Sequence, residues 1–258
     1  MVTLVPVQNL TGTKGSNERH VFLLVTLLIL VLLFMPGAIT AAASFVASRT
    51  QQLPLPHGTV HGLESVALDG LGHGPYNGVS AGRILKWNDD KLGWTTYAYG
   101  PGYDSRTCTL SKFSRESDNA RESRCGRPLG LRFYQKSDDL YVADAYKGLM
   151  WVAPGGGEAT VLVNQVDGFP LHFTDGVDVD QVTGQVYFTD SSMKYQRSQH
   201  EMVTRTGDST GRLMSYDPQT SDVIVLQTGM TYPNGVALST NHTHLVVAST
   251  GLCNLLRH

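Results

Sequence analysis

The sequence predicts an all-β fold, specifically a β-propeller, and three observations lead to this prediction. A segment recurs with variations four times after residue 60, and each copy starts with a short hydrophobic strand beside a Gly or Ser. The strands are rich in β-branched and aromatic residues, and Gly, Asp and Asn separate them. No long stretch has helical periodicity, except at 192–206 in the third copy. Repeated four-stranded units are typical of propellers, in which each unit forms one radial blade.

The strands can be assigned copy by copy. The predicted strands are 64–68, 76–80, 82–87 and 94–99 in the first copy, 130–134, 139–143, 148–153 and 159–163 in the second, 176–180, 185–189, 211–216 and 223–227 in the third, and 235–239, 244–249 and 253–257 in the fourth. A polar linker at 49–60 precedes them, so the propeller is expected over 61–258. A β-sandwich would not explain repeats with matched strand openings. Because the fourth copy is incomplete, we expect a truncated member of a larger class.

The amino-terminal stretch has the character of a targeting segment. Val21 to Met35 reads VFLLVTLLILVLLFM, and no charged residue lies between Arg19 and Arg49. Residues 1–48 are therefore predicted to be a cytosolic lead followed by a signal peptide or a signal anchor. Small residues at Ala41–Ala43 favour cleavage, whereas the length of the apolar run favours anchoring. Both outcomes place the propeller in the lumen of the secretory pathway, and the membrane is a partner only if the segment stays uncleaved.

Two further features are typical of a lumenal protein. Asn241-His242-Thr243 is a glycosylation sequon between two predicted strands, where a turn would expose Asn241. Cys108 and Cys125 flank a polar insert, and an oxidising compartment would let them close that loop. Two unrelated free thiols are the alternative. Cys253 has no obvious partner.

Composition and charge exclude some classes of function. The net charge is −2, and no basic patch with interleaved aromatic residues is visible, so nucleic acid is not expected as a partner. Three cysteines are too few for a disulfide-framework fold. A globular domain that binds a small-molecule substrate is the remaining expectation.

The four strand openings predict a site on the propeller axis. The residue before the Gly or Ser is Glu64, Asp175 and Asn234 in the first, third and fourth copies, and Leu129 in the second. Since the first strand of every blade lines the central channel, these positions should form a ring. Three oxygen-bearing side chains in a ring suit a hard cation such as calcium, or a polar substrate. The alternative is that Asp175 and Asn234 are turn residues that favour a particular backbone conformation.

Other motifs carry less weight. Residues 78–82 read GVSAG, the pattern of a nucleophile elbow, but an elbow is followed by a helix and 83–87 reads as a strand. A hairpin turn is expected there instead. The segment Asp190–Ser192, followed by Tyr195, either borders a pocket at the channel mouth or is only a polar strand end. No P-loop, dinucleotide fingerprint, zinc-ligand spacing or HExxH motif occurs.

Several ordered motifs resemble the strictosidine synthase-like family. They are CGRPLGL from Cys125, LYVADAYKGL from Leu140, VYFTDSS from Val186, TGRL from Thr210 and YPNGV from Tyr232. The similarity runs from about residue 56 to the end and is greatest to the plant members. The related adipocyte plasma membrane-associated proteins share the motifs and carry a membrane anchor. The resemblance implies a six-bladed propeller in the secretory pathway, in the vacuole or at the endoplasmic reticulum.

The resemblance also implies an activity. The activity that names the family is the Pictet–Spengler condensation of tryptamine with the aldehyde secologanin, in which a glutamate of a late blade serves as general acid and base. That blade would lie beyond His258, so we expect no catalytic glutamate and no condensation from this chain. Tyr195 matches a pocket-lining tyrosine of the synthases. Cys108 and Cys125 match a pair that family members join as a disulfide.

The wider superfamily, with paraoxonases and gluconolactonase-like proteins, implies a different chemistry. Those proteins hold calcium on the axis and hydrolyse esters or lactones. Glu64 and Asn234 match two of their metal-ligand positions, and Asp175 lies beside a further one, where Thr174 replaces the usual asparagine. Three functions therefore stay open: a strictosidine synthase-like enzyme, a calcium-dependent ester or lactone hydrolase, and a non-catalytic binding module.

Overall fold

The computed structural model describes residues 52–55, 62–108 and 118–258. The targeting segment predicted at 1–48 and most of the linker at 49–60 lie outside the described residues. Contacts divide the chain into two units, Met1–Leu53 and Pro54–His258, and all the sheets belong to the second. Within the described part of the chain, no helix is long and apolar enough to cross a membrane.

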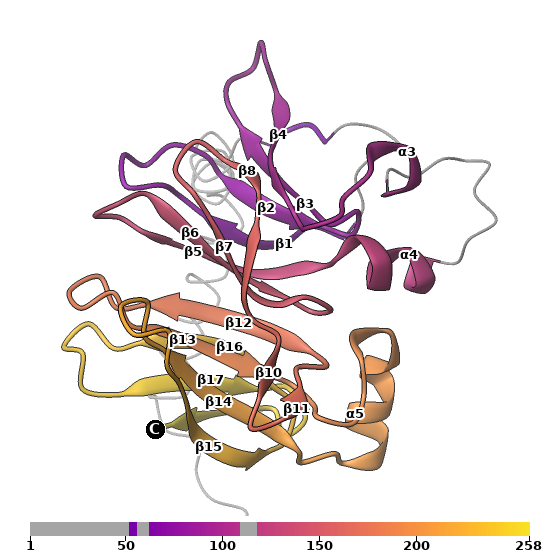
Figure 1. The fold of residues 1–258 in the computed structure, drawn as a ribbon, viewed down its shortest axis with the longest axis vertical. Coiled ribbons are helices and arrows are strands. Elements are labelled where there is room, and N and C mark those ends of the chain that lie inside the picture. Colours follow the sequence, from indigo (N-terminus) through magenta and orange to yellow (C-terminus); the bar gives the residue numbers. More distant parts are fainter. Residues whose placement is uncertain (1–51, 56–61, 109–117) are drawn as a thin grey trace, which may run out of the picture. The chain divides into compact units, whose positions relative to one another are not determined.

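The described residues form an all-β fold of successive antiparallel sheets (Figure 1). The first sheet contains β1 (Glu64–Ala67), β2 (Tyr76–Val79), β3 (Arg83–Trp87) and β4 (Trp94–Tyr99), and the second contains β5 (Pro128–Tyr134), β6 (Asp139–Asp144), β7 (Gly148–Val152) and β9 (Thr160–Val163). The third contains β12 (Thr174–Val179), β13 (Val186–Asp190), β14 (Gly211–Tyr216) and β15 (Val223–Met230), and the fourth contains β16 (Pro233–Leu238), β17 (Leu245–Ser249) and β18 (Asn254–Arg257). These strands confirm the predicted all-β class and strand order, with ends shifted by a few residues.

The structure also contains short elements that the sequence patterns do not predict. They are β8 (Gly157–Glu158), which pairs in parallel with β4, the ribbon of β10 (Gln165–Val166) and β11 (Phe169–Pro170), and the helices α3 (Ser105–Cys108) and α4 (Asp118–Cys125). Two-residue strands are too short to show alternation. Helix α4 buries the charged residues Arg121 and Glu122, so it lacks the apolar stripe that predicts a helix.

Two local predictions are confirmed. The helical periodicity at 192–206 corresponds to a 3₁₀ turn, η1 (Arg197–Gln199), followed by α5 (His200–Thr206). The GVSAG segment is a hairpin turn, because Val79 pairs with Arg83 and the amide of Gly82 donates to the Val79 carbonyl at 3.1 Å. It therefore lacks the strand-to-helix geometry of a nucleophile elbow.

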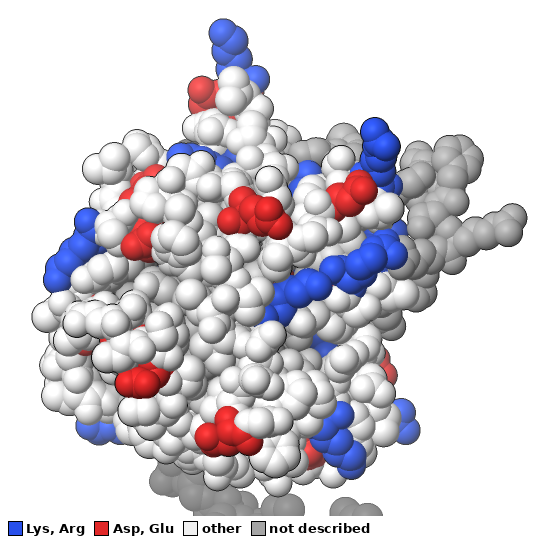
Figure 2. All heavy atoms as spheres, viewed as in Figure 1, with Lys and Arg blue, Asp and Glu red and all other residues white. Residues whose placement is uncertain are grey.

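The sheets stack on one another through their faces. The side chains that fill these interfaces are Tyr76, Ile84, Phe133 and Leu140 between the first and second sheets, Tyr141, Leu149, Val177 and Phe188 between the second and third, and Leu213, Leu245 and Val247 between the third and fourth. Burying a side chain of this size contributes roughly 1.5–3 kcal/mol. On the face shown in Figure 2, acidic and basic side chains are scattered among a majority of uncharged residues.

A disulfide joins the two helices that precede the second sheet. Cys108 of α3 and Cys125 of α4 are bonded, with their Cα atoms 5.7 Å apart, and both are fully buried. Arg124 of α4 also donates to the Thr107 carbonyl at 3.3 Å. Cys253 is free and exposed. The bridge holds the segment that leads into β5.

Candidate functional site

The three predicted axial residues all lie near the beginning of the first strand of a sheet. Glu64 begins β1, Asp175 is the second residue of β12, and Asn234 is the second residue of β16. All three strands have an irregular register just there, which is the signature of a β-bulge. The turn interpretation of Asp175 and Asn234 is therefore wrong, because both residues lie inside strands and the glycine after each has no left-handed backbone.

Each polar axial residue of the third and fourth sheets has a hydroxyl partner from its own sheet. Ser191 Oγ lies 3.1 Å from Asp175 Oδ2, and Asn234 Nδ2 donates to Thr250 Oγ1 at 3.3 Å. Ser191 and Thr250 each follow the second strand of their sheet. In the second sheet the same two positions are Leu129 and Ala145, which belong to one apolar cluster. The axial residue and its partner thus change together from one sheet to the next.

The segment Asp190–Ser192 is buried and does not border an open pocket. Asp190 Oδ2 accepts from Arg212 Nη2 at 2.7 Å, and Ser192 Oγ donates to Asp208 at 2.6 Å. Asp190, Ser191 and Ser192 are all fully inaccessible. Of these three residues, Ser191 contacts an axial residue, Asp175.

Ser191 indicates the protonation state of Asp175. Its hydroxyl lies 2.6 Å from the Pro233 carbonyl, which can only accept, as well as 3.1 Å from Asp175 Oδ2. One hydroxyl proton cannot serve both acceptors, so a protonated Asp175 satisfies the arrangement best. Burial, the largest cause, and the nearby charge of Glu64 raise the pKa of Asp175 to about 7, although the hydrogen bond with Ser191 acts in the opposite direction. Asp175 is therefore a carboxyl group that gains or loses its proton near neutral pH.

Charged side chains missed by the sequence analysis surround Glu64. Arg127 Nη2 lies 3.9 Å from Glu64 Oε2, and Arg127 Nε lies 3.7 Å from Glu122 Oε1. Arg197 Nη1 donates to the other Glu122 oxygen at 2.9 Å. We call the set Glu64, Glu122, Arg127, Asp175, Arg197 and Asn234 the axial cluster. The CGR motif contains Arg127, but nothing in the motif shows which carboxylates it meets.

Aromatic residues adjoin the axial cluster. Phe173 and Tyr232 have ring centroids 5.5 Å apart, and Tyr146 and Tyr195 pack against the same apolar cluster. Burial, followed by the charge of Asp175, raises the pKa of Tyr232 to about 12, with a smaller effect from Glu64. Tyr232 therefore lies within electrostatic reach of both acids. Tyr195, the predicted pocket residue, therefore packs against the same cluster as Tyr146, Phe173 and Tyr232.

The axial cluster does not fit the predicted calcium ion. Calcium takes six to eight oxygen ligands. Here a guanidinium lies beside Glu64, Ser191 lies at Asp175, and Asn234 turns its amide nitrogen to Thr250. Among the residues that the structure describes, no group of three His, Cys, Asp or Glu side chains is arranged to hold a metal.

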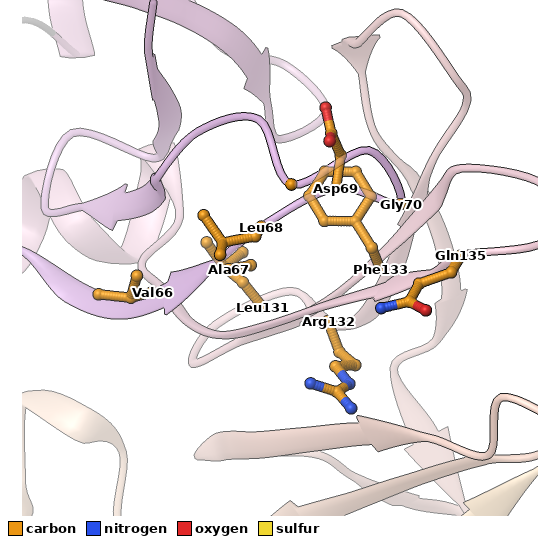
Figure 3. Close-up of a pocket in the computed structure, with 10 residues that line it drawn as sticks. Val66, Ala67, Leu68, Asp69, Gly70, Leu131, Arg132, Phe133 and Gln135 are labelled. Carbon is orange, nitrogen blue, oxygen red and sulfur yellow. The ribbon is translucent and has the colours of Figure 1, made fainter.

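A cavity of about 510 Å³ lies at the other ends of the first strands (Figure 3). Val66, Leu68 and Phe133 contribute apolar surface to it, and Arg132 points toward β12, where its Nε lies 2.8 Å from Asp178 Oδ1. Asp69, the acid that lines this cavity, accepts from its own loop and from the Tyr76 hydroxyl at 3.0 Å. We therefore place the candidate site at the axial cluster and not here.

Comparisons with known proteins agree with the sequence motifs. A family model described as strictosidine synthase matches residues 175–258. The chain is 43% identical over 196 residues to STRICTOSIDINE SYNTHASE-LIKE 10 of Arabidopsis thaliana, covering 76% of this chain and 51% of that protein. It is 39% identical over 235 residues to STRICTOSIDINE SYNTHASE-LIKE 12 of the same plant, covering 90% and 66%. The chain spans about half the length of most curated relatives it matches.

Solved structures support the fold alone. A chain of a nidogen/laminin complex aligns with a TM-score of 0.52 at 14% identity, covering 80% of this chain and 68% of that one. A gluconolactonase from Xanthomonas campestris aligns with a TM-score of 0.51 at 15% identity, covering 77% and 58%. The described sheets are thus propeller-like.

Proposed function

This chain belongs to the strictosidine synthase-like family, and we propose on that basis that its axial cluster binds an amine of the kind that the family's synthases condense with an aldehyde. One observation supports this most: the partly exposed carboxylate Glu64 acts electrostatically on Tyr232, whose apolar cluster is bordered by the half-buried rings of Tyr146 and Tyr195. An arylethylamine such as tryptamine has an ammonium group that can pair with the Glu64 carboxylate and an aromatic ring that can pack against the aromatic residues.

The side chains have distinct roles in this proposal. Glu64 pairs with the ammonium group of the amine. Tyr146 and Tyr195, which are half-buried, hold the aromatic ring. The arrangement of the oxygen atoms of Glu64, Asp175 and Asn234 gives no support to the alternative, a calcium-dependent ester or lactone hydrolase.

Binding of tryptamine to the full chain, measured by calorimetry, tests the proposal. Glu64→Gln should weaken the affinity about tenfold to a hundredfold, because it removes a charge-assisted hydrogen bond. Glu158→Gln is the matched control, since Glu158 is exposed and belongs to β8. Equal affinities of the two variants would contradict the proposed amine site. Mass spectrometry of tryptamine–secologanin mixtures then separates an enzyme from a binding module.

We also propose that the chain acts in the lumen of the secretory pathway, in the vacuole or at the endoplasmic reticulum. The buried disulfide and the exposed sequon support this. Asn241 lies in the turn between β16 and β17, where its Oδ1 accepts from Ser239 Oγ and Thr243 Oγ1, each at 2.8 Å. Protein expressed in plant cells should lose apparent mass on treatment with a peptide N-glycosidase, and Asn241→Gln should abolish the shift. An unchanged mobility of the wild type would contradict glycosylation at this site.

A further inference from the structure

We propose that Arg127 is the resident cation of the axial cluster, holding Glu64 and Glu122 in place and occupying the position that a metal ion would need. Arg127 is in this sense a positioning residue. The inference goes beyond the proposed function, since it concerns how the acids are held and not what they bind.

Burial and enclosure of the guanidinium support this role. The Arg127 side chain is 2% exposed, and its Nη1 donates to the Gly62 carbonyl. A Cβ atom at Gly62 would lie 2.9 Å from both Nη1 and Nη2, and Gly62 has a φ of +59°. The backbone thus passes close to the guanidinium, at a residue whose left-handed conformation favours glycine.

The charges around Arg127 come from several elements and nearly balance. Glu64 of β1 and Glu122 of α4 face the guanidinium directly, and Asp144 of β6 adds a weaker attraction. Arg197 of η1 binds Glu122 from the other side. Two guanidinium groups therefore accompany two glutamates, and a divalent cation entering the cluster would meet both positive charges.

The backbone of Arg127 is fixed on both sides. The disulfided Cys125 lies two residues before it, and β5 begins with the next residue, Pro128. The Arg127 carbonyl also accepts from the Ala145 amide at 3.0 Å. This anchoring suits a residue that holds other side chains in position.

Metal binding by the full chain tests the proposal. Wild-type protein should have the same melting temperature in EDTA and in millimolar calcium, and should not sensitise terbium emission. Arg127→Met should melt lower, gain terbium emission and become stabilised by calcium, because the carboxylates lose their counter-ion. Arg127→Lys keeps the charge and should stay insensitive to calcium. Arg132→Met is the matched control: it removes a guanidinium from a pair with Asp178, and should not create a metal site.

Two results would overturn the proposal. One is a wild-type protein that calcium stabilises, with the effect lost in Glu64→Gln. The other is an Arg127→Met variant that folds but responds to metal no more than Arg132→Met does. Neither readout uses the amine, so failure here and failure of tryptamine binding are distinguishable.

Discussion

Asp144 and Asp190 end the second strands of neighbouring sheets and are both fully buried, but among the described residues only Asp190 has an ionic partner. Arg212 lies opposite Asp190 in the strand ladder, and the ion pair is 2.7 Å long. Gly148 lies opposite Asp144, whose Oδ1 accepts from the amides that follow β6. Burial raises the pKa of Asp144 to about 6, against 3.8 for an ordinary aspartate.

The raised pKa of Asp144 predicts how stability depends on pH. The folded state binds the Asp144 proton more tightly than the unfolded state does. Protonated Asp144 therefore stabilises the folded state fully below pH 3.8, and this stabilisation is lost as the pH rises through about 6. A difference of about two pKa units corresponds to about 3 kcal/mol. Asp144→Asn should therefore flatten the fall in melting temperature between pH 4 and pH 7.

Asp167→Asn serves as the control for this experiment. Asp167 is exposed between β10 and β11 and has a left-handed backbone, which asparagine also tolerates. Its pH profile should match that of the wild type. A profile of Asp144→Asn that also matches the wild type would show that Asp144 does not cause the pH dependence.

At the scale of the element, the first strands of the second and third sheets each approach the next first strand so closely that the glycine after the axial position is required. A Cβ atom at Gly130 would lie 2.6 Å from the Asp175 carbonyl, and one at Gly176 would lie 2.4 Å from the Asn234 carbonyl. These contacts are with backbone atoms, which cannot swing away. The repeated glycine is therefore needed for close packing of the strands, although its sequence pattern is typical of a turn.

Substituting these glycines tests the role of close packing. Gly176→Ala should lower the free energy of unfolding by about 1–3 kcal/mol, because the strands must separate to admit the methyl group. Gly235→Ala is the matched control, since nothing lies within 4 Å of its Cβ position. Chemical denaturation measures both. Equal stabilities of the two variants would contradict the close-packing explanation.

The elements differ in how well the sequence predicts them. Strands such as β3 and β14 have apolar alternation and begin beside a glycine, so local pattern is sufficient. β8 exists because Gly157 and Glu158 meet β4 of another sheet, a contact that no local pattern contains. α4 is held by its disulfide, and its buried charged residues hide it from any search for an apolar stripe.

At the scale of the whole propeller-like unit, the sheets follow one another in chain order, and each described sheet packs a face against the sheet that follows it. The repeat predicts this order because each copy closes its own hydrogen bonds within one meander and leaves apolar faces to be buried. The six blades that the family resemblance implies stay a prediction.

The sequence by itself determined the all-β class, the order of the strands, the family and the position of Glu64, Asp175 and Asn234 near the start of a first strand. These features depend on local periodicity and on the matching of one repeat with another. Only the tertiary structure decided what the axial residues meet. Arg127 is 63 residues from Glu64 along the chain, and Arg197 is 75 residues from Glu122. Such pairs form because the sheets stack at particular distances, and the pairing of charges follows distance in space, which no pattern along the chain records.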